Sequence, residues 1–141
     1  MSDPIREKFV ISQKAVLIRD NKCLIMKMTK SSEHWELPGG RIDEGEMFDT
    51  SFAREMKEEL NFDNFEHLGV VHYETWYIPD GSAVCGIANL IKNDKDEVVI
   101  SDEHLDMKWV TQDELDDYNF FWPSSKKMIK QGFEKYNLIN K

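Results

Sequence analysis

The segment from Gly40 to Phe62 constrains the fold of this chain more than any other part of the sequence. It reads G-R-I-D-E-G-E-M-F-D-T-S-F-A-R-E-M-K-E-E-L-N-F, a glycine-containing loop followed by an amphipathic run. Apolar side chains recur at every fourth position of that run, at Phe48, Phe52, Met56 and Leu60. This spacing predicts a helix that buries one stripe against the rest of the protein.

The same helix carries three glutamates, Glu55, Glu58 and Glu59. A helix advances about 100° per residue, so the three carboxylates lie within one arc of roughly 100°. Like charges this close repel one another unless a cation lies among them. Glu59 also projects between two positions of the apolar stripe, where an isolated carboxylate is costly. Oxygen ligands of this kind suit Mg²⁺ or Mn²⁺, so the helix predicts a divalent metal site.

These residues resemble the signature of the Nudix hydrolases, G-x5-E-x7-R-E-U-x-E-E-x-G-U, in which U is an apolar residue. The matching positions are Gly40, Glu46, Arg54, Glu55, Met56, Glu58, Glu59 and Phe62. One position departs, because Asn61 stands where the signature has its last glycine. Asparagine is the next-best residue for a left-handed helix cap, so we expect a small loss of stability and no loss of chemistry. The alternative, a charged helix face in solvent, explains neither the glycines nor Glu46.

The resemblance implies an α+β fold, in which a mixed, curved sheet lies between the helix of the signature and a C-terminal helix. A length of 141 residues suits one domain, so we expect a single Nudix domain over residues 1–141, with the signature at residues 40–62. Alternating and β-rich runs predict two hairpins and one further strand. The expected strands are Lys8–Ile18, Lys22–Met28, Glu66–Ile78, Ser82–Ile91 and Met107–Val110.

Two helices are expected after the last strand. Thr111–Glu114 has the form of a capping box, which opens a helix. Ser124–Tyr136 follows a proline and carries apolar residues about one turn apart, so it is predicted to pack its apolar face on the sheet.

Charge and composition exclude several classes of partner. The net charge is −9 and the pI is near 4.9, which argues against binding of a nucleic-acid polymer. Neither a leader nor an apolar stretch of membrane-spanning length is apparent, and Cys23 and Cys85 lack metal-ligand spacing. We therefore expect a cytoplasmic protein with reduced thiols and no membrane partner. The sequence leaves open whether two chains form a homodimer.

The resemblance implies roles for the residues of the signature. Glu55, Glu58 and Glu59 are expected to hold the metal, with the backbone carbonyl of Gly39 completing its ligands. Arg54 is expected to orient Glu58, one turn away. Glu46 is expected to brace the loop.

Many family members carry another acidic residue before a tryptophan-containing strand, where it acts as general base or extra metal ligand. Glu103 is the candidate here, while Asp102, Asp106 and Glu55 remain alternatives. Its neighbour His104 is expected to be a bystander.

The groups that recognise the substrate lie outside the signature. Arg41, Lys27 and Lys30 are the candidates for binding its phosphates. Aromatic rings stack on nucleobases, and Trp122 is the first candidate for this role among several aromatic residues. Trp122 stands where purine-reading members of the MutT branch carry an asparagine, and Asn119 is the candidate to take its place. Strict specificity for oxidised guanine is therefore not expected. The other aromatic candidates are Trp76, Tyr77, Phe120 and Phe121.

The sequence therefore predicts an Mg²⁺-dependent pyrophosphohydrolase, with Mn²⁺ as the alternative ion. Its substrate would be a nucleoside triphosphate or another nucleoside diphosphate derivative, including ADP-ribose or a nucleotide sugar. A Nudix-fold module that binds a nucleotide or metabolite without cleaving it is the alternative from another class. An isomerase of isoprenyl diphosphates is a third reading, but the further catalytic cysteine and second metal site that it needs cannot be placed here.

Overall fold

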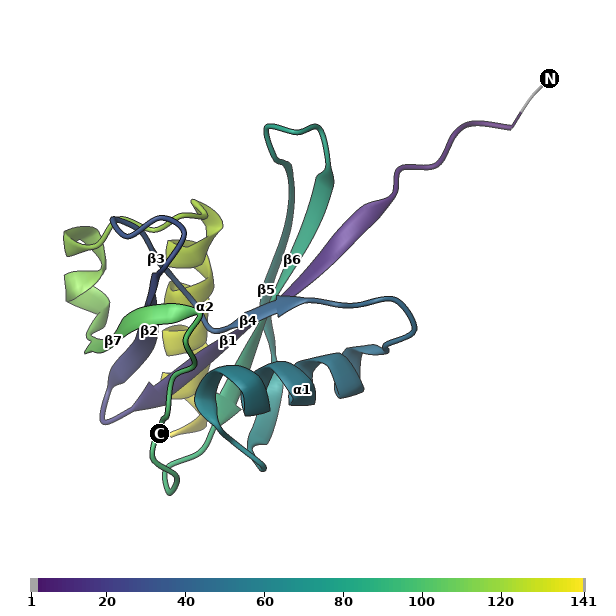
Figure 1. Cartoon of the computed structure of the whole chain (residues 1–141). Helices are drawn as coiled ribbons and strands as arrows, with labels where there is room; N and C mark the ends of the chain where they lie inside the picture. Colours follow the sequence, from purple (N-terminus) through teal and green to yellow (C-terminus); the bar gives the residue numbers. More distant parts are fainter. Residues whose placement is uncertain (1–2, 141) are drawn as a thin grey trace.

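The computed structural model describes residues 3–140 and places a mixed sheet between two helices (Figure 1). The strands are β1 (Phe9–Arg19), β2 (Lys22–Met28), β3 (Trp35–Glu36), β4 (Gly39–Arg41), β5 (Glu66–Tyr77), β6 (Ala83–Lys92) and β7 (His104–Val110). The helices are α1 (Phe48–Leu60), the short 3-10 helix η1 (Gln112–Asp117) and α2 (Ser124–Ile139).

Strand β1 lies at the centre of the sheet, whose order is β3-β2-β1-β6-β5. It pairs in parallel with β6 and antiparallel with β2 and β4, while β7 extends the sheet by pairing with β2. The predicted mixed sheet is therefore confirmed. Because β4 pairs with β1, the double glycine Gly39-Gly40, at the start of the signature loop, lies directly beside the central strand.

Both predicted hairpins are present. Asp20 and Asn21 connect β1 to β2 with positive φ angles of 49° and 62°. Positive φ at both central residues matches the right-handed twist of the strands, and Asn and Asp tolerate it better than other side chains. The second hairpin joins β5 to β6 through Gly81, whose φ is 92°.

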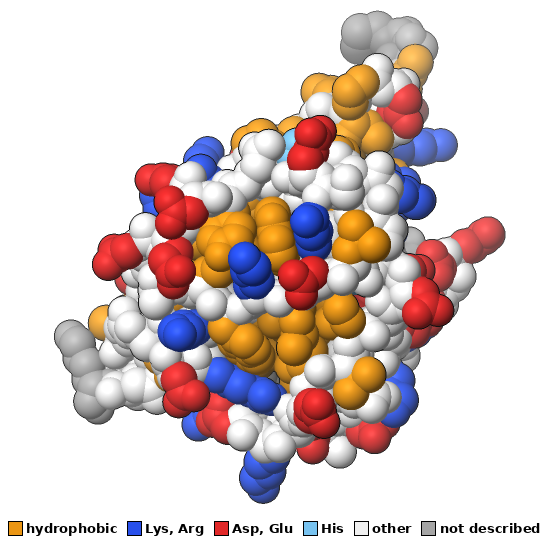
Figure 2. Space-filling model, turned by 60° about the vertical axis from the view of Figure 1, so that its left-hand side comes forward, with side chains coloured by type: hydrophobic (Ala, Val, Ile, Leu, Met, Phe, Trp, Pro, Cys, Tyr) orange, Lys and Arg blue, Asp and Glu red, His pale blue; other side chains and the backbone are white. Residues whose placement is uncertain are grey.

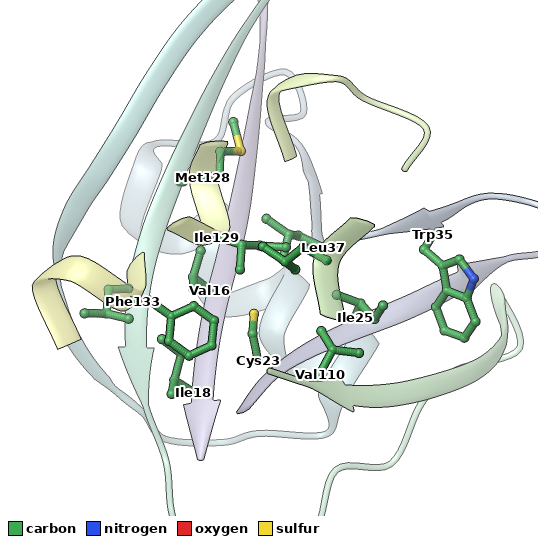
Figure 3. Close-up of a cluster of buried hydrophobic side chains, with 13 residues drawn as sticks. Val16, Ile18, Cys23, Ile25, Trp35, Leu37, Val110, Met128, Ile129 and Phe133 are labelled. Carbon is green, nitrogen blue, oxygen red and sulfur yellow. The ribbon is translucent and has the colours of Figure 1, made fainter. Parts of the chain in front are cut away.

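Side chains of β1 alternate between the two faces of the sheet, which fixes two separate cores. Ala15 and Leu17 pack under α1 with Phe52, Met56 and Leu60. Val16 and Ile18 pack under α2 with Met128, Ile129 and Phe133 (Figure 3). Each fully buried large aliphatic side chain contributes about 1.5–3 kcal/mol, so both helices are anchored mainly by these contacts.

Helix α2 approaches the central strand closely at Gly132. A Cβ added there would lie 2.5 Å from the Cγ1 atom of Val16. The glycine thus lets α2 pack against β1 at the middle of the sheet.

Four sequence predictions need correction. Phe48 is expected in the buried stripe but is 48% exposed, at the first residue of α1. Strand β7 begins at His104 rather than Met107, because Met28 pairs with His104 and extends the β2–β7 ladder. The capping box at Thr111 opens a 3-10 helix of six residues, and α2 continues three residues past Tyr136 to Ile139.

The left-handed cap expected at the end of α1 is present. Asn61 caps α1 in the left-handed region, with φ 61° and ψ 34°. Cys23 is buried and Cys85 partly buried, and both are free thiols. Within residues 3–140, no helix has the length and apolar character needed to cross a bilayer.

Candidate active site

The loop before α1 is held by a fork of hydrogen bonds between Arg54 and Glu46. The guanidinium donates from Nε to Glu46 Oε2 at 2.7 Å and from Nη2 to Glu46 Oε1 at 2.8 Å. The backbone N–H of Asp43 also donates to Glu46 Oε1, at 2.9 Å. The hydrogen bonds from Arg54 lower the pKa of Glu46 to about 2. The bracing contact expected for Glu46 is therefore present.

Arg54 also contacts two glutamates of its own helix. Its Nη1 atom lies 3.1 Å from Glu55 Oε1 and 3.1 Å from Glu58 Oε2. Glu58 is the more open of the two, with 56% of its side chain exposed against 11% for Glu55. We call Asp43, Glu46, Arg54, Glu55 and Glu58 the Arg54 cluster; it surrounds one guanidinium with four carboxylates.

Glu59 points away from this cluster and into the protein. Only 4% of its side chain is exposed, and its Oε2 atom accepts a short hydrogen bond from the backbone N–H of Gly39. Burial raises the pKa of Glu59 to about 7. Gly39 has φ 132°, and a Cβ there would lie 2.0 Å from the carbonyl oxygen of Gln13. Only glycine therefore lets the backbone donate to Glu59 from this position.

A second carboxylate, that of Glu55, packs against the same Gly39-Gly40 backbone. A Cβ at Gly40 would lie 2.5 Å from Glu55 Oε1, so the Glu55 side chain rests against this glycine. Burial raises the pKa of Glu55 as well. The double glycine thus has a buried carboxylate in contact with each of its residues.

Three residues complete the surroundings of Glu59: Lys14 and Glu36, which the sequence did not single out, and His104, which is expected from the sequence to be a bystander. His104 Nε2 lies 3.0 Å from Glu36 Oε2 and 3.6 Å from Glu59 Oε1. Lys14 Nζ lies 3.2 Å from Glu36 Oε1 and donates to the carbonyl of Leu37 at 3.3 Å. We call Lys14, Glu36, Glu59 and His104 the Glu59 cluster.

In the Glu59 cluster, opposite charges favour the ionised form of Glu36 and His104 and offset the cost of burying them. Burial alone would raise the pKa of Glu36, but the Lys14 ammonium and His104 outweigh it and bring that pKa to about 2. Burial likewise opposes a charged imidazole, yet Glu36 and Glu59 raise the pKa of His104. His104 is 2% exposed at its side chain, so it is a buried partner of the acids and not a solvent-exposed loop residue.

The three glutamates do not form the single patch that their helical spacing suggested. Glu55 and Glu58 turn to Arg54, whereas Glu59 turns to Gly39 and His104, because each carboxylate faces its nearest donor. Across residues 3–140, no group of three acidic, histidine or cysteine side chains is gathered in a metal-ligating arrangement. The donor chemistry still fits a hard divalent cation, since two buried carboxylates and a glycine backbone adjoin one another.

A pocket of about 290 Å³ opens beside Glu59. It brings together several predicted site residues, and its lining consists of Met28, Thr29, Lys30, Glu36, Gly39, Glu59, Glu103 and His104. Glu103 is exposed at the mouth, where its backbone carbonyl accepts a hydrogen bond from the hydroxyl of Thr29 at 3.0 Å. The structure therefore places Lys30 and Glu103 with Gly39 and Glu59.

Four predicted substrate-binding residues do not line this pocket: Arg41, Lys27, Trp122 and Asn119. Arg41 is exposed at the end of β4, where its carbonyl accepts a hydrogen bond from Arg54. Lys27 places its ammonium 6.0 Å from the ring of Trp35 and does not line the pocket beside Glu59. Figure 2 turns the side of β3 and β7 toward the viewer, where hydrophobic patches have Lys and Arg side chains among them.

Trp122 belongs to a separate hollow of about 360 Å³. Its ring packs on Trp76 with 5.1 Å between the ring centroids, and Tyr77 and Phe121 line the same hollow. Asn119 is exposed, and its backbone carbonyl accepts a hydrogen bond from the N–H of Trp35 at 2.8 Å.

A larger and mainly apolar pocket, of about 470 Å³, lies between α1 and strands β5 and β6. Phe48, Phe52 and Phe65 form its walls, and Gln13 and Asn89 contribute amides. None of the residues predicted for catalysis or binding lines it, so size alone does not identify the candidate site.

Comparison with known proteins identifies the family and the fold of this chain. A sequence model of the NUDIX domain matches residues 9–132. The RNA pyrophosphohydrolase of Pelagibacter ubique (strain HTCC1062) is 34% identical over 64 residues. That match covers 42% of this chain and 40% of the relative, so it spans less than half of either protein.

Solved structures share the fold at low sequence identity. The E. coli ORF135 protein superposes with a TM-score of 0.76 at 19% identity, covering 94% of each chain. The MutT protein from Methanosarcina mazei Go1 superposes with a TM-score of 0.75 at 19% identity, covering 95% of this chain and 99% of that one. These likenesses establish the fold, with an open mixed sheet and flanking helices.

Proposed function

This chain belongs to the Nudix family of hydrolases, and from that premise we propose that it cleaves a diphosphate linkage in a nucleoside triphosphate or another nucleoside diphosphate derivative. The products would be a nucleoside monophosphate with pyrophosphate or a phosphorylated remnant. The observation that supports this most is the burial of Glu59 against Gly39, with Glu55 in contact with Gly40. Two buried carboxylates along one glycine backbone are best compensated by a divalent cation.

We propose that Mg²⁺, or Mn²⁺, is held by Glu55, Glu58, Glu59 and the carbonyl of Gly39. When bound, such an ion neutralises phosphate charge and makes a water nucleophilic near neutral pH. The backbone N–H of Gly39 fixes Glu59. These ligands would thus be oriented before substrate arrives.

Arg54 is proposed to hold the side chains of Glu55 and Glu58, since its fork on Glu46 leaves Nη1 free to contact both. Glu103, at the mouth of the pocket, is the proposed general base, with Glu55 as the alternative. Water would attack phosphorus directly, without a covalent enzyme intermediate.

Substrate recognition is proposed to use Lys30 in the pocket beside Glu59 together with residues outside that pocket. Lys30 lines it and is placed to meet phosphates, with Arg41 and Lys27 as more distant cations. Trp122 is the proposed base-stacking residue, and Asn119 a polar contact near it. The substrate would be a small nucleotide, handled by a single cytoplasmic domain over residues 1–141.

A non-catalytic binding module is the second candidate. The observation that favours it is the division of the three glutamates between two directions. An ADP-ribose or nucleotide-sugar pyrophosphatase remains the alternative within the enzyme class.

One assay separates these candidates. Canonical and oxidised nucleoside triphosphates, dinucleoside polyphosphates, ADP-ribose and nucleotide sugars are each incubated with the protein and Mg²⁺ or Mn²⁺. Metal-dependent release of a nucleoside monophosphate supports the proposed enzyme and identifies its substrate branch. Tight nucleotide binding without phosphate release under either metal would instead support the binding module.

A further inference from the structure

Lys14 occupies an unusual position for a charged residue. It lies in the central strand, immediately before the four buried apolar residues from Ala15 to Ile18. Only 9% of its side chain is exposed. A buried ammonium is unfavourable unless it is paired and hydrogen-bonded. Lys14 meets both conditions through Glu36 Oε1 at 3.2 Å and the carbonyl of Leu37 at 3.3 Å.

Glu36 is engaged at both of its carboxylate oxygens. Lys14 contacts Oε1, and His104 Nε2 contacts Oε2 at 3.0 Å. Glu36 nevertheless lines the same pocket as Glu59. An acidic side chain that lines a cation site would ordinarily bind the cation. In Glu36, however, both carboxylate oxygens are already bound to Lys14 and His104.

His104 links this pair to Glu59. Its Nε2 atom is closer to Glu36 than to Glu59 Oε1, at 3.0 Å against 3.6 Å. Glu59 Oε2 is meanwhile held by the N–H of Gly39. The imidazole therefore stands between the two carboxylates and leaves Glu59 Oε1 as the less engaged oxygen.

We propose that Lys14 is a positioning residue that keeps Glu36 out of the metal site. Its ammonium neutralises Glu36, which then holds His104 beside Glu59 as a wall of the pocket. This inference rests on the proposed function, since it concerns how the metal ligands are selected. Without the charge of Lys14, Glu36 joins the ligands; without Glu36, the ammonium is left to compete with the metal for Glu59.

The test uses metal binding rather than turnover alone. Mn²⁺ is titrated into the wild-type protein, Lys14→Met, Glu36→Gln and the double variant Lys14→Met/Glu36→Gln, without nucleotide. Neighbouring charges couple strongly, so we expect Lys14→Met to tighten Mn²⁺ binding by about tenfold and Glu36→Gln to weaken it by about tenfold. The double variant removes both charges and returns the affinity to within about threefold of wild type.

Kinetics supply a second readout. Lys14→Met is expected to lower kcat by about tenfold while KM for the nucleotide stays within about twofold, because the misplaced metal harms chemistry and Lys14 does not touch substrate. The double variant recovers most of kcat. Lys92→Met is the matched control, since it removes an exposed lysine that pairs with Asp94 at the end of β6, and it leaves Mn²⁺ affinity unchanged.

Each outcome decides the matter. Equal Mn²⁺ affinity in the wild type and all three variants overturns the inference and leaves the proposed function intact. A raised KM with unchanged kcat in Lys14→Met also overturns it, because Lys14 would then contact substrate. If Lys14→Met does not fold, failure of the double variant to restore the affinity lost in Glu36→Gln overturns it. If wild-type protein binds no Mn²⁺, the proposed function fails and this inference fails with it.

Discussion

The Arg54 cluster and the Glu59 cluster both depend on α1, yet they are built in different ways. The Arg54 cluster draws its residues from the loop and helix between Asp43 and Glu58 and remains partly open to solvent. The Glu59 cluster draws one residue each from β1, β3, α1 and β7, and three of its four side chains are less than 10% exposed. In the Arg54 cluster, contacts between residues close in sequence orient the side chains. In the Glu59 cluster, residues from distant parts of the chain are buried together, and a charged side chain is tolerated there only if it is paired.

The energetics of the two clusters differ accordingly. Exposed ion pairs contribute about 0–1 kcal/mol, so the Arg54 cluster is expected to affect geometry more than stability. Breaking a buried pair is far more costly because an uncompensated charge remains. Substitutions in the Glu59 cluster should therefore change stability and activity together.

The largest expected effect is that of Glu59→Gln on turnover. Loss of this proposed metal ligand is expected to reduce kcat on the order of a hundredfold or more. Glu58→Gln, in the more exposed position, is expected to reduce it less. Steady-state rates on the best substrate at saturating Mg²⁺ give the ranking, and near wild-type rates for both variants would remove these residues from the mechanism.

Gly39→Ala is expected to destabilise the protein by about 3 kcal/mol, because the new Cβ would overlap Gln13 at a φ that side chains rarely adopt. Gly45→Ala is the matched control, since Gly45 also has a positive φ, 85°, but no atom lies within 4 Å of its added Cβ. We expect about 1 kcal/mol for the control. Urea unfolding measures both, and equal losses would mean that close approach to β1 is unimportant.

In the metal-free protein, Glu59 and Glu46 should contribute to the free energy of unfolding with opposite dependence on pH. The pKa of Glu59 is raised from 4.5 to about 7, so its contribution is present below 4.5 and is lost as pH rises through 7. The decline should be on the order of 2–3 kcal/mol. The pKa of Glu46 is lowered to about 2, so its contribution is present above 4.5 and is lost as pH falls through 2.

Urea unfolding of the chelated protein at several pH values between 2 and 8 checks this opposition. Glu59→Gln should flatten the decline with rising pH, and saturating Mg²⁺ should reduce it in the wild type. A decline of the same size in Glu59→Gln would assign it to another group.

Arg54→Lys should have the smallest effect on stability, below about 1 kcal/mol, because the cluster is partly exposed. Lysine cannot reproduce the fork on Glu46 while contacting Glu55 and Glu58. We therefore expect kcat to fall by about tenfold without a matching loss of stability. Thermal melting and steady-state kinetics of Arg54→Lys test this. If stability and kcat fall together, Arg54 acts only by stabilising the fold.

The sequence predicted the local features of the molecule well. The signature spacing led to α1, its Asn61 cap and the contact of Arg54 with Glu58, because these depend on residues within a few turns. Hairpins and the mixed sheet followed from alternation, turn residues and the family resemblance. The contact between Glu46 and Arg54 was also within reach, since the two are eight positions apart.

The Glu59 cluster could not be predicted in the same way. Lys14, Glu36 and His104 are separated by up to 90 positions and meet only because β1, β3 and β7 share a sheet (104 − 14 = 90). No spacing rule connects them. The signal available in the sequence was a lysine just before an apolar β run. The same reason explains why one helical arc failed to predict that Glu59 faces away from Glu55 and Glu58.

The central claim is that Glu59 and Gly39 form one side of a divalent metal site. Its most direct test is a crystal structure of the protein with Mn²⁺ and a nonhydrolysable nucleotide analogue, using the anomalous signal of the metal. We predict a Mn²⁺ peak bonded to Glu59 and adjacent to the Gly39 backbone, with the analogue's phosphates on its open side. A bound analogue whose metal lies away from Glu59 would contradict the account.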